Sequence, residues 1–463
     1  MGGAPRDAAL GRRLADLDLA CAGDAEGLAR AVARGTGGTL VVLDDATRIY
    51  RIALPEGQID VAALQGADIA EDLARRDFTV NAIAVPVEGG AGGARLGAPV
   101  DPRGGFADLR KRTLRASGPE AFRDDPVRLL RAFRIAAQLG LRIEPRTLRA
   151  IRREARRIRG AAGERVRQEL LSLLSLDGAH AWLRQMDETR LLTAVLPGLA
   201  DARACARRYY GTGGVMRHTL DVAERMDTLL GGLGKALPGL EKQIEEHLDA
   251  WGGEGAHALL RLASLLHDIA KPATARMIGG RLRFFGHDER GARMAGRELA
   301  RLRFSRRETD AVCACVRHHL RPGSLASGAT ISPRSIYRFF RDLGAHGVPL
   351  LLLCWADYAS YASPARLKRA LPTLSKEPGP PGPERQKTAR HLRIVTLLLR
   401  AYFTRAEVAR PVSLLNGHDV MRELGIPPGP AVGRILGRLA EAQAAGRVKD
   451  RDGALRFVRR FQK

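Results

Sequence analysis

Hydrophobic and polar positions follow two different patterns along the chain. Residues 39–54 and 58–63 form short runs in which aliphatic and β-branched residues alternate or cluster, broken by Asp-Asp and Pro-Glu-Gly. Such runs predict strands. From about residue 119 onward, Leu, Ile and Ala recur at spacings of three and four with Arg between them, which predicts helices. The pattern therefore indicates an α+β chain, with a small mixed sheet and flanking helices followed by a long all-helical part.

Changes in this pattern predict four regions. They are a head over 1–117, a helical neck over 118–200, a larger helical domain over 201–375 and a C-terminal helical segment over 387–463. A linker is predicted over Lys376–Glu384, because its four prolines cannot lie inside a helix. The last segment contains a predicted helix near 431–445.

Charge indicates the kind of partner. The 463 residues include 76 Lys and Arg against 51 Asp and Glu, a formal net charge of +25. Such an excess suits a polyanion such as RNA, although a genome that favours Arg codons would also produce it. Five cysteines without a Cys-x-x-Cys pair predict reduced thiols and a cytoplasmic protein. No uncharged apolar run is long enough for a membrane span.

The head carries three segments whose chemistry fits together. Gly2 and Gly3 would let backbone N–H groups approach a phosphate closely. Asp16 and Asp18 are two apart, so a strand would place both carboxylates on one face, where a divalent cation would hold them. Arg-Arg-Asp follows at 75–77. Together these residues indicate metal-assisted chemistry on a nucleoside triphosphate.

This set resembles the class II nucleotidyltransferases, which are the bacterial CCA-adding enzymes and poly(A) polymerases. That family carries Gly-Gly-x-Val-Arg-Asp, with Pro5 here in place of Val, then Asp-x-Asp and Arg-Arg-Asp-Phe-Thr-x-Asn-Ala. Further similar segments lie at 101–109, 122–134 and 163–165. The family places a helix and a strand before the glycines, so we expect either an upstream start or a head that lacks part of its sheet.

The resemblance implies roles for particular residues. Asp16 and Asp18 would be the catalytic carboxylates and bind two Mg²⁺ ions. Asp60 is either a third carboxylate or an ordinary surface residue. The ribose would contact Arg76, Asp77 and Asn81, unless these form a salt bridge at the neck. The implied nucleotide-binding residues are Gly2, Gly3, Arg6, Asp7, Arg76, Asp77, Asn81, Asp125, Arg128 and Arg131.

Asp125 and Arg128 carry the inference about base choice. They are three apart on a predicted helix and would share a face. An Asp acceptor beside an Arg donor matches the edges of cytosine and adenine and mismatches uracil and guanine. The alternative is an ordinary surface ion pair.

The region 201–375 carries a second set of ligand residues. His218, the pair His267-Asp268, and Asp357 resemble the four-ligand core of the HD phosphohydrolase superfamily. His287 and His318 match the additional ligands of its two-metal members. The resemblance implies a divalent metal (Mg²⁺, Mn²⁺ or a transition metal) that generates hydroxide for phosphoester hydrolysis. Metal binding without hydrolysis is the alternative.

The expected function is the addition of C, A or both to the 3′ end of tRNA, or of another RNA, from CTP and ATP. The segment 387–463 would contribute to RNA binding. One alternative is a poly(A) polymerase. The other is an HD phosphohydrolase whose head only binds RNA.

Overall fold

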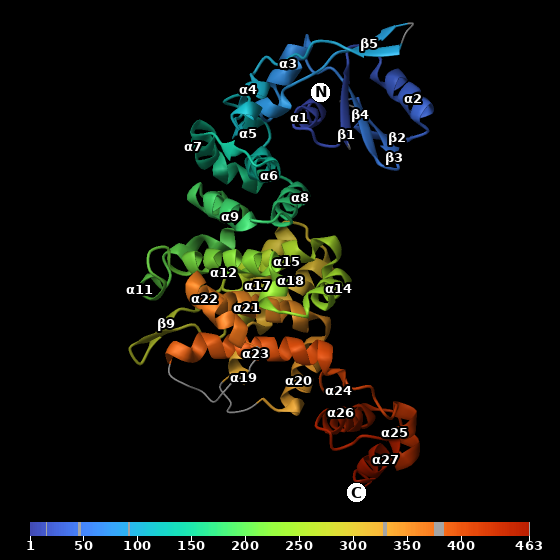
Figure 1. The fold of residues 1–463 in the computed structure, drawn as a ribbon, viewed down its shortest axis with the longest axis vertical. Helices are drawn as coiled ribbons and strands as arrows, with labels where there is room; N and C mark the ends of the chain where they lie inside the picture. The colour runs from blue at the N-terminus through green and yellow to red at the C-terminus, as the bar shows by residue number, and fades with distance from the viewer. Residues whose placement is uncertain (15, 45–47, 91–92, 327–330, 375–383, 463) are drawn as a thin grey trace. The chain divides into compact units, whose positions relative to one another are not determined.

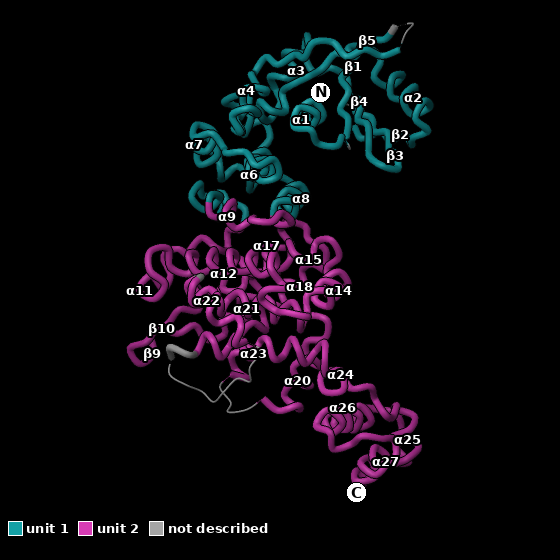
Figure 2. Tube along the Cα trace, viewed as in Figure 1, with its two compact units in different colours: residues 1–173, 185–195 teal, residues 174–184, 196–463 magenta. Residues whose placement is uncertain are grey.

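The computed structural model describes residues 1–14, 16–44, 48–90, 93–326, 331–374 and 384–462 (Figure 1). The chain packs into two compact units, 1–173 with 185–195 and 174–184 with 196–463 (Figure 2). The four predicted regions are finer than these units, and their boundaries remain predictions. The predicted linker Lys376–Glu384 lies outside the described residues, except for Glu384. None of the described helices is long and apolar enough to cross a membrane.

A four-stranded mixed sheet forms the core of the head, as predicted. Its strands are β1 (Asp16–Cys21), β2 (Thr39–Asp44), β3 (Ile49–Leu54) and β4 (Gly57–Ala63), in the order β1-β4-β3-β2. β1 pairs with β4 in parallel and the other pairs are antiparallel. Helix α2 (Ala25–Thr36) covers one face, where its Ala29 packs with the buried Ile52 and Val61. The opposite face is left for Asp16 and Asp18.

Short elements connect this sheet to the neck helices. In the head these are α1 (Gly3–Ala9), α3 (Ile69–Ala74), η1 (Thr79–Asn81), β5 (Val87–Gly90), β6 (Gly93–Leu96), α4 (Gly105–Arg110) and β7 (Thr113–Leu114). The neck contains α5 (Ala121–Asp124), α6 (Arg128–Leu139), β8 (Arg142–Ile143), α7 (Pro145–Glu154), η2 (Ala155–Gly160), α8 (Gly163–Leu174), α9 (Ala179–Glu188) and α10 (Leu191–Val195). Parallel pairing of β7 with β8 ties head to neck.

Helices of the second unit pack around α21 (Gly347–Ser360). Its residues 350–353 are four consecutive leucines, all fully buried. Each contributes roughly 1.5–3 kcal/mol by leaving water. The surrounding elements are η3 (Pro197–Arg203), α11 (Arg207–Tyr210), α12 (Gly214–Leu230), α13 (Leu233–Ala236), α14 (Glu241–Gly252), η4 (Gly253–Gly255), α15 (Ala256–Leu266), α16 (Lys271–Thr274), β9 (Arg276–Ile278), β10 (Arg281–Arg283), α17 (His287–Arg301), α18 (Arg306–His318), α19 (Arg321–Leu325), α20 (Pro333–Leu343), η5 (Gly344–His346), α22 (Pro364–Ala370), η6 (Leu371–Thr373) and α23 (Glu384–Thr404).

The C-terminal helices have a small hydrophobic core of their own. They are α24 (Ala406–Ala409), α25 (Gly417–Leu424), α26 (Pro430–Ala444) and α27 (Arg451–Arg459). Val420, Leu439 and Val458 meet in this core. Helix α26 confirms the helix predicted near 431–445. The α+β class and the helical character of the second part are therefore confirmed.

Candidate active site and candidate metal centre

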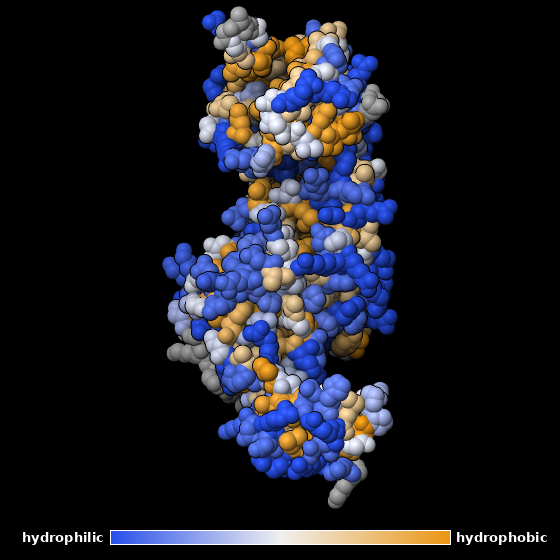
Figure 3. Space-filling view, turned by 90° about the vertical axis from the view of Figure 1, so that its right-hand side faces the viewer, coloured by the Kyte–Doolittle hydropathy of each residue, from blue (hydrophilic) through white to orange (hydrophobic). Residues whose placement is uncertain are grey.

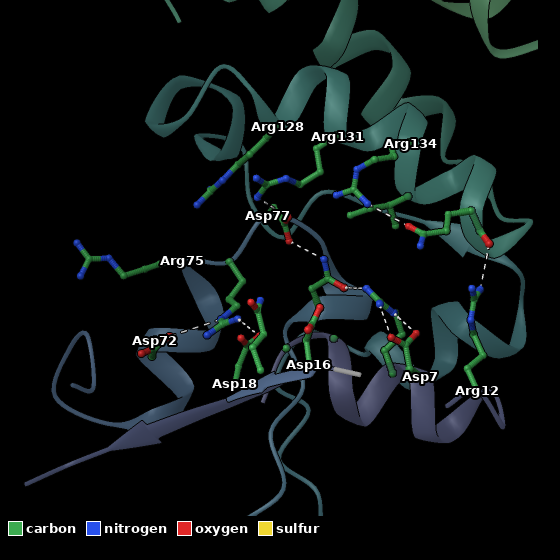
Figure 4. Close-up of a pocket in the computed structure, with 18 of the residues that line it drawn as sticks. Asp7, Arg12, Asp16, Asp18, Asp72, Arg75, Asp77, Arg128, Arg131 and Arg134 are labelled. Carbon is green, nitrogen blue, oxygen red and sulfur yellow. Dashed lines mark hydrogen bonds and ion pairs between the residues drawn. The ribbon is translucent and has the colours of Figure 1, made fainter. Parts of the chain in front are cut away.

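One pocket in unit 1 gathers residues from all the head motifs. Its volume is ≈ 820 Å³, and its lining includes eight arginines and five aspartates. Figure 4 shows Arg128, Arg131 and Arg134 of α6 on one side of the pocket, with Asp16 and Asp18 of β1 on the other. An arginine-rich wall opposite a carboxylate pair suits a triphosphate that brings or meets metal ions.

Position 2 requires a glycine, because the backbone there passes very close to the carboxylate site. Its φ is +77°, a conformation that favours glycine, and a Cβ there would lie 2.6 Å from Asp18 Oδ2 and 2.8 Å from the Arg76 guanidinium. Arg76 Nη1 lies 3.9 Å from Asp18 Oδ2. Burial raises the pKa of Asp18, although Arg76 opposes that shift. A cation would reverse the shift, since it favours the charged carboxylate.

Five of the other nucleotide-binding candidates form one hydrogen-bonded chain. Arg6 donates to both oxygens of Asp7, at 2.9 and 2.7 Å, and to Asn81 Oδ1 at 2.5 Å. Asn81 Nδ2 donates to Asp77 Oδ1 at 3.0 Å. Arg131 then approaches Asp77 Oδ2 at 3.5 Å. The structure thus brings Arg6, Asp7 and Asn81 together, and Arg6 holds the predicted ribose-binding residue Asn81 in place.

The proposed third carboxylate lies next to the pair but is already engaged. Asp60 on β4 is the register partner of Asp18 on β1, so their side chains leave the same face. Arg51 donates to both Asp60 oxygens at 2.8 Å. A role for Asp60 as a third carboxylate stays a prediction.

The prediction that Asp125 and Arg128 lie on one helix is wrong. Helix α5 ends at Asp124 and α6 begins at Arg128, so extended Asp125, at φ −144° and ψ 102°, lies in the break. The reason is Pro126, which disfavours a helical conformation for the residue before it. The two side chains still approach each other, with Arg128 Nε 4.0 Å from Asp125 Oδ2.

Sequence reasoning missed the strongest partner of Asp125. Arg165 of α8 donates to Asp125 Oδ2 at 2.7 Å. Burial alone would raise the pKa of Asp125, but this hydrogen bond and charge outweigh it and lower the pKa. Buried Glu169, on the same helix, accepts from Arg131 at 2.8 Å and from Arg134 at 2.6 Å. Helix α8 thus fixes three side chains beside the pocket.

The second candidate centre lies among the helices of unit 2. His218 Nε2 is 3.3 Å from both Asp268 Oδ2 and Asp357 Oδ1. His267 Nε2 is 3.2 Å from Asp268 Oδ2, and His287 Nε2 is 3.4 Å from Asp268 Oδ1. Asp268 therefore lies between two groups of ligand atoms, as a bridging carboxylate would.

One predicted ligand is replaced by its neighbour. His319, and not His318, joins Asp268 and His287, with the two imidazole Nε2 atoms of His287 and His319 3.2 Å apart. His318 is only partly buried and is absent from the two ligand groups found among the described residues. The spacing of buried Val312, Cys315 and Val316 could have revealed this, because a residue at 319 continues their helical face.

The residues of this cluster fit a divalent metal. The Nδ1 atoms of His267, His287 and His319 lie 2.7–2.8 Å from backbone carbonyls, so they donate there and leave Nε2 free to coordinate. Burial lowers the pKa of His319 to about 4, which keeps its imidazole neutral. His267 Nε2 and Asp357 Oδ1 are buried without a well-aligned hydrogen bond among the described residues. Histidines with carboxylates are suitable ligands for such ions.

Lys271 is a further residue that the site prediction omitted. Its Nζ lies 2.5 Å from Asp268 Oδ2 and donates to the Tyr210 hydroxyl at 2.8 Å. The spacing of three from Asp268 and the positive charge were visible in the sequence. Burial there could not be read from it.

Three family models match the chain. "Poly A polymerase head domain" matches residues 1–115, "Probable RNA and SrmB- binding site of polymerase A" matches 140–203, and "HD domain" matches 215–361. These ranges contain the pocket carboxylates, the α8 side chains and the second cluster, respectively.

Similar proteins and structures cover nearly the whole chain. An A-adding tRNA nucleotidyltransferase of Deinococcus radiodurans is 34% identical, over 100% of this chain and 94% of that protein. A CC-adding tRNA nucleotidyltransferase of Thermus thermophilus is 33% identical, over 99% and 92%. The structure of a CCA-adding enzyme with ATP aligns with a TM-score of 0.64 at 21% identity, over 99% of this chain and 88% of that one. At that identity the structural likeness concerns the fold alone.

Proposed function

The chain belongs to the family of tRNA nucleotidyltransferases and poly(A) polymerases, and we propose that it adds C, A or both to the 3′ end of tRNA from CTP and ATP. The observation that carries this proposal is the single pocket that joins Asp16 and Asp18 to the arginines of α6. The full-length relatives supply the substrate class, since they are tRNA enzymes that add A or CC.

In the proposed mechanism, the carboxylates and the arginines of the pocket have different roles. Asp16 and Asp18 would hold Mg²⁺, which supplies charge stabilisation at the attacking 3′-hydroxyl and the leaving pyrophosphate. Arg76 lies beside Asp18 and would contact the triphosphate or ribose. Asp77 and Asn81, held by Arg131 and Arg6, would orient the ribose.

Base choice would depend on Asp125 and Arg128 without a nucleic-acid template. The Asp125 carboxylate would accept from an exocyclic amino group, and Arg128 would donate to the adjacent ring nitrogen. The 4.0 Å between them leaves room for the two groups to address separate atoms of one base edge. Arg165 would keep the carboxylate ionised and oriented, because it donates to it directly.

The decisive experiment offers tRNA transcripts that end before CCA, at C and at CC. Each is incubated with Mg²⁺ and one of the four nucleoside triphosphates, and the product lengths are read. Incorporation of CTP alone on the first two transcripts identifies CC addition, and ATP alone on the last identifies A addition. Use of both identifies complete CCA addition. Long A tracts on unrelated RNA would instead identify a poly(A) polymerase, and no incorporation would overturn the proposal.

A second function is favoured by the buried ligand cluster of unit 2. We propose that it binds a divalent metal and hydrolyses a phosphoester, with a 2′,3′-cyclic phosphate on an RNA end as the candidate substrate. Such an end has no free 3′-hydroxyl to be extended. Addition of water with cleavage of the bond between phosphorus and O3′ would leave a 2′-phosphate and a free 3′-hydroxyl, so this step would serve the head. Metal content of the purified protein and turnover of a cyclic phosphate test this. Protein that holds no metal and hydrolyses nothing would leave the domain as a scaffold.

Five free cysteines suit the reducing cytoplasm, where we expect the protein to act.

A further inference from the structure

Two exposed aromatic side chains, Tyr209 and Tyr361, lie at the second centre. Among the described residues, the exposed aromatic side chains are Tyr209, Phe285 and Tyr361, at 73%, 74% and 46% exposure. They come from three separate elements: α11, the turn before α17, and the end of α21. Exposed apolar side chains that lie together on a surface are typical of a ligand-binding or interaction site. Tyr361 contacts the candidate ligand His218 directly, and Tyr209 is connected to His218 through Tyr210.

Ring contacts connect these side chains to the ligands. The Tyr361 ring lies 5.1 Å from that of His218, and the Tyr210 ring stacks on His218 at 4.9 Å. Tyr209 packs edge-on against Tyr210 at 4.8 Å. An aromatic wall therefore leads from a buried metal-ligand candidate outward to solvent.

Phe285 belongs to the segment before α17, which approaches the same centre through its neighbour Phe284. The carbonyl of the preceding Phe284 contacts His287 Nδ1 at 2.7 Å, and the Phe284 ring lies 5.6 Å from Lys271 Nζ. Lys271 also contacts Tyr210, so α11 and the segment after β10 both flank one lysine. Figure 1 shows α11 and β9 on the same side of unit 2.

A pocket of ≈ 390 Å³ opens along this wall, lined by Tyr209, Tyr210, Arg217, His218, Asp221, Ser360 and Tyr361. The side chain of Arg217 is 58% exposed and lies 4.0 Å from Asp221. The pocket thus combines solvent-facing rings, an accessible cation and a wall that includes a metal-ligand candidate. This combination matches a base, a phosphate and a reacting phosphoester.

We propose that Tyr209 and Tyr361 form a base-binding subsite of the HD centre, so that its phosphoester substrates bind partly through a stacked nucleobase. This inference rests on the proposed hydrolase function. Stacking tolerates any base, because every base has a π-face. Arg217 would bind a flanking phosphate, as expected for the end of an RNA chain and not for a small sugar phosphate.

A matched pair of substrates tests the subsite in the full-length protein. Adenosine 2′,3′-cyclic phosphate and methyl riboside 2,3-cyclic phosphate share the reacting ring and differ only in the base. In Tyr209→Leu we expect the KM of the adenosine compound to rise about fivefold or more, with kcat little changed, because one stacking contact is lost. The base-free compound should be unaffected. Tyr209→Phe, which keeps the ring, and Met277→Leu on the nearby hairpin serve as controls.

Binding to metal-free protein provides a second readout. Calorimetry with adenosine 2′-phosphate should give a weaker Kd for Tyr209→Leu than for wild type, and the head pocket is the same in both proteins. If wild type hydrolyses neither substrate, the hydrolase proposal fails, while a weakened Kd still supports the subsite. If wild type hydrolyses both substrates equally and Tyr209→Leu changes neither KM nor Kd, the subsite is overturned and the hydrolase stands.

Discussion

The two candidate centres differ in how complete they are without a ligand. In the head, the side chain of Asp18 is 41% exposed and faces a wide pocket lined by arginines. In the HD cluster, the six side chains that carry candidate ligand atoms are only 1–15% exposed. Backbone carbonyls there already fix the orientation of three imidazoles.

The difference reflects what each centre is built to bind. A triphosphate brings its own negative charge, so an open site needs carboxylates, arginines and room more than a finished cage. A resident catalytic metal takes most of its ligands from the protein, and these must be placed and desolvated in advance. Arginine dominates the first centre and histidine the second for the same reason. Substitutions in one centre should therefore leave the other intact.

The largest effect is expected from Asp18→Asn. Loss of one carboxylate from the carboxylate pair should lower nucleotide addition by on the order of a thousandfold, because developing charge on the transferring phosphate loses its metal. Binding of tRNA should persist, and so should cyclic-phosphate hydrolysis. Single-nucleotide extension of tRNA measures the loss. Asp24→Asn is the matched control, since Asp24 caps α2 and Asn caps equally well. Normal addition by Asp18→Asn would remove the head assignment.

Asp268→Asn should produce the opposite pattern. This residue lies between both groups of ligand atoms, so its loss should lower metal content and cyclic-phosphate turnover together, on the order of a hundredfold for turnover. Addition to tRNA should continue at the wild-type rate. Elemental analysis and a turnover assay on the same preparation measure this. If addition is also lost, the two centres are coupled and the comparison fails.

Base choice should depend on Arg128 more than triphosphate binding does. In Arg128→Ala we expect misincorporation of UTP and GTP to rise by about ten- to a hundredfold, the equivalent of about 1.5–3 kcal/mol for a charged hydrogen bond. Competition between correct and incorrect nucleotides gives the ratio. Unchanged selectivity would reduce Asp125 and Arg128 to a structural pair.

Arg165→Ala offers a sharper form of that test. It removes the 2.7 Å contact to Asp125 without touching Arg128, so we expect a smaller loss of selectivity of the same kind. Arg165→Lys keeps the charge and should recover part of it. A loss of kcat with unchanged selectivity would instead indicate that Arg165 only supports the neck.

The smallest effect concerns the basic surface. Hydrophilic side chains cover most of the face in Figure 3, and Arg152 and Arg156 are exposed within the segment 140–203 that matches an RNA-binding model. Arg152→Gln with Arg156→Gln should weaken tRNA binding severalfold and flatten the plot of log affinity against log salt by about two units of slope. Arg30→Gln is the control, since Glu26 already pairs with Arg30. An unchanged slope would place the RNA elsewhere.

The spacing of residues within single strands and helices accounts for much of what the sequence predicted correctly. Alternation on a strand put Asp16 and Asp18 on one face, and helical periodicity separated the head from the helices. Two errors were also local. Pro126 and the buried face of α18 would have indicated the break before Arg128 and the choice of His319. Both errors came from motif spacing taken from the family, which ignores the conformational preferences of the local residues.

By itself, the sequence determined the fold class, the family motifs and the residue types of both centres, because periodicity and short motifs are properties of neighbouring residues. Only the tertiary structure decided which distant side chains meet. Arg165 is forty positions from Asp125, and Tyr209 of α11 and Tyr361 at the end of α21 line one pocket. Such meetings depend on how helices pack against one another, and that packing is set by many weak contacts spread over the whole core.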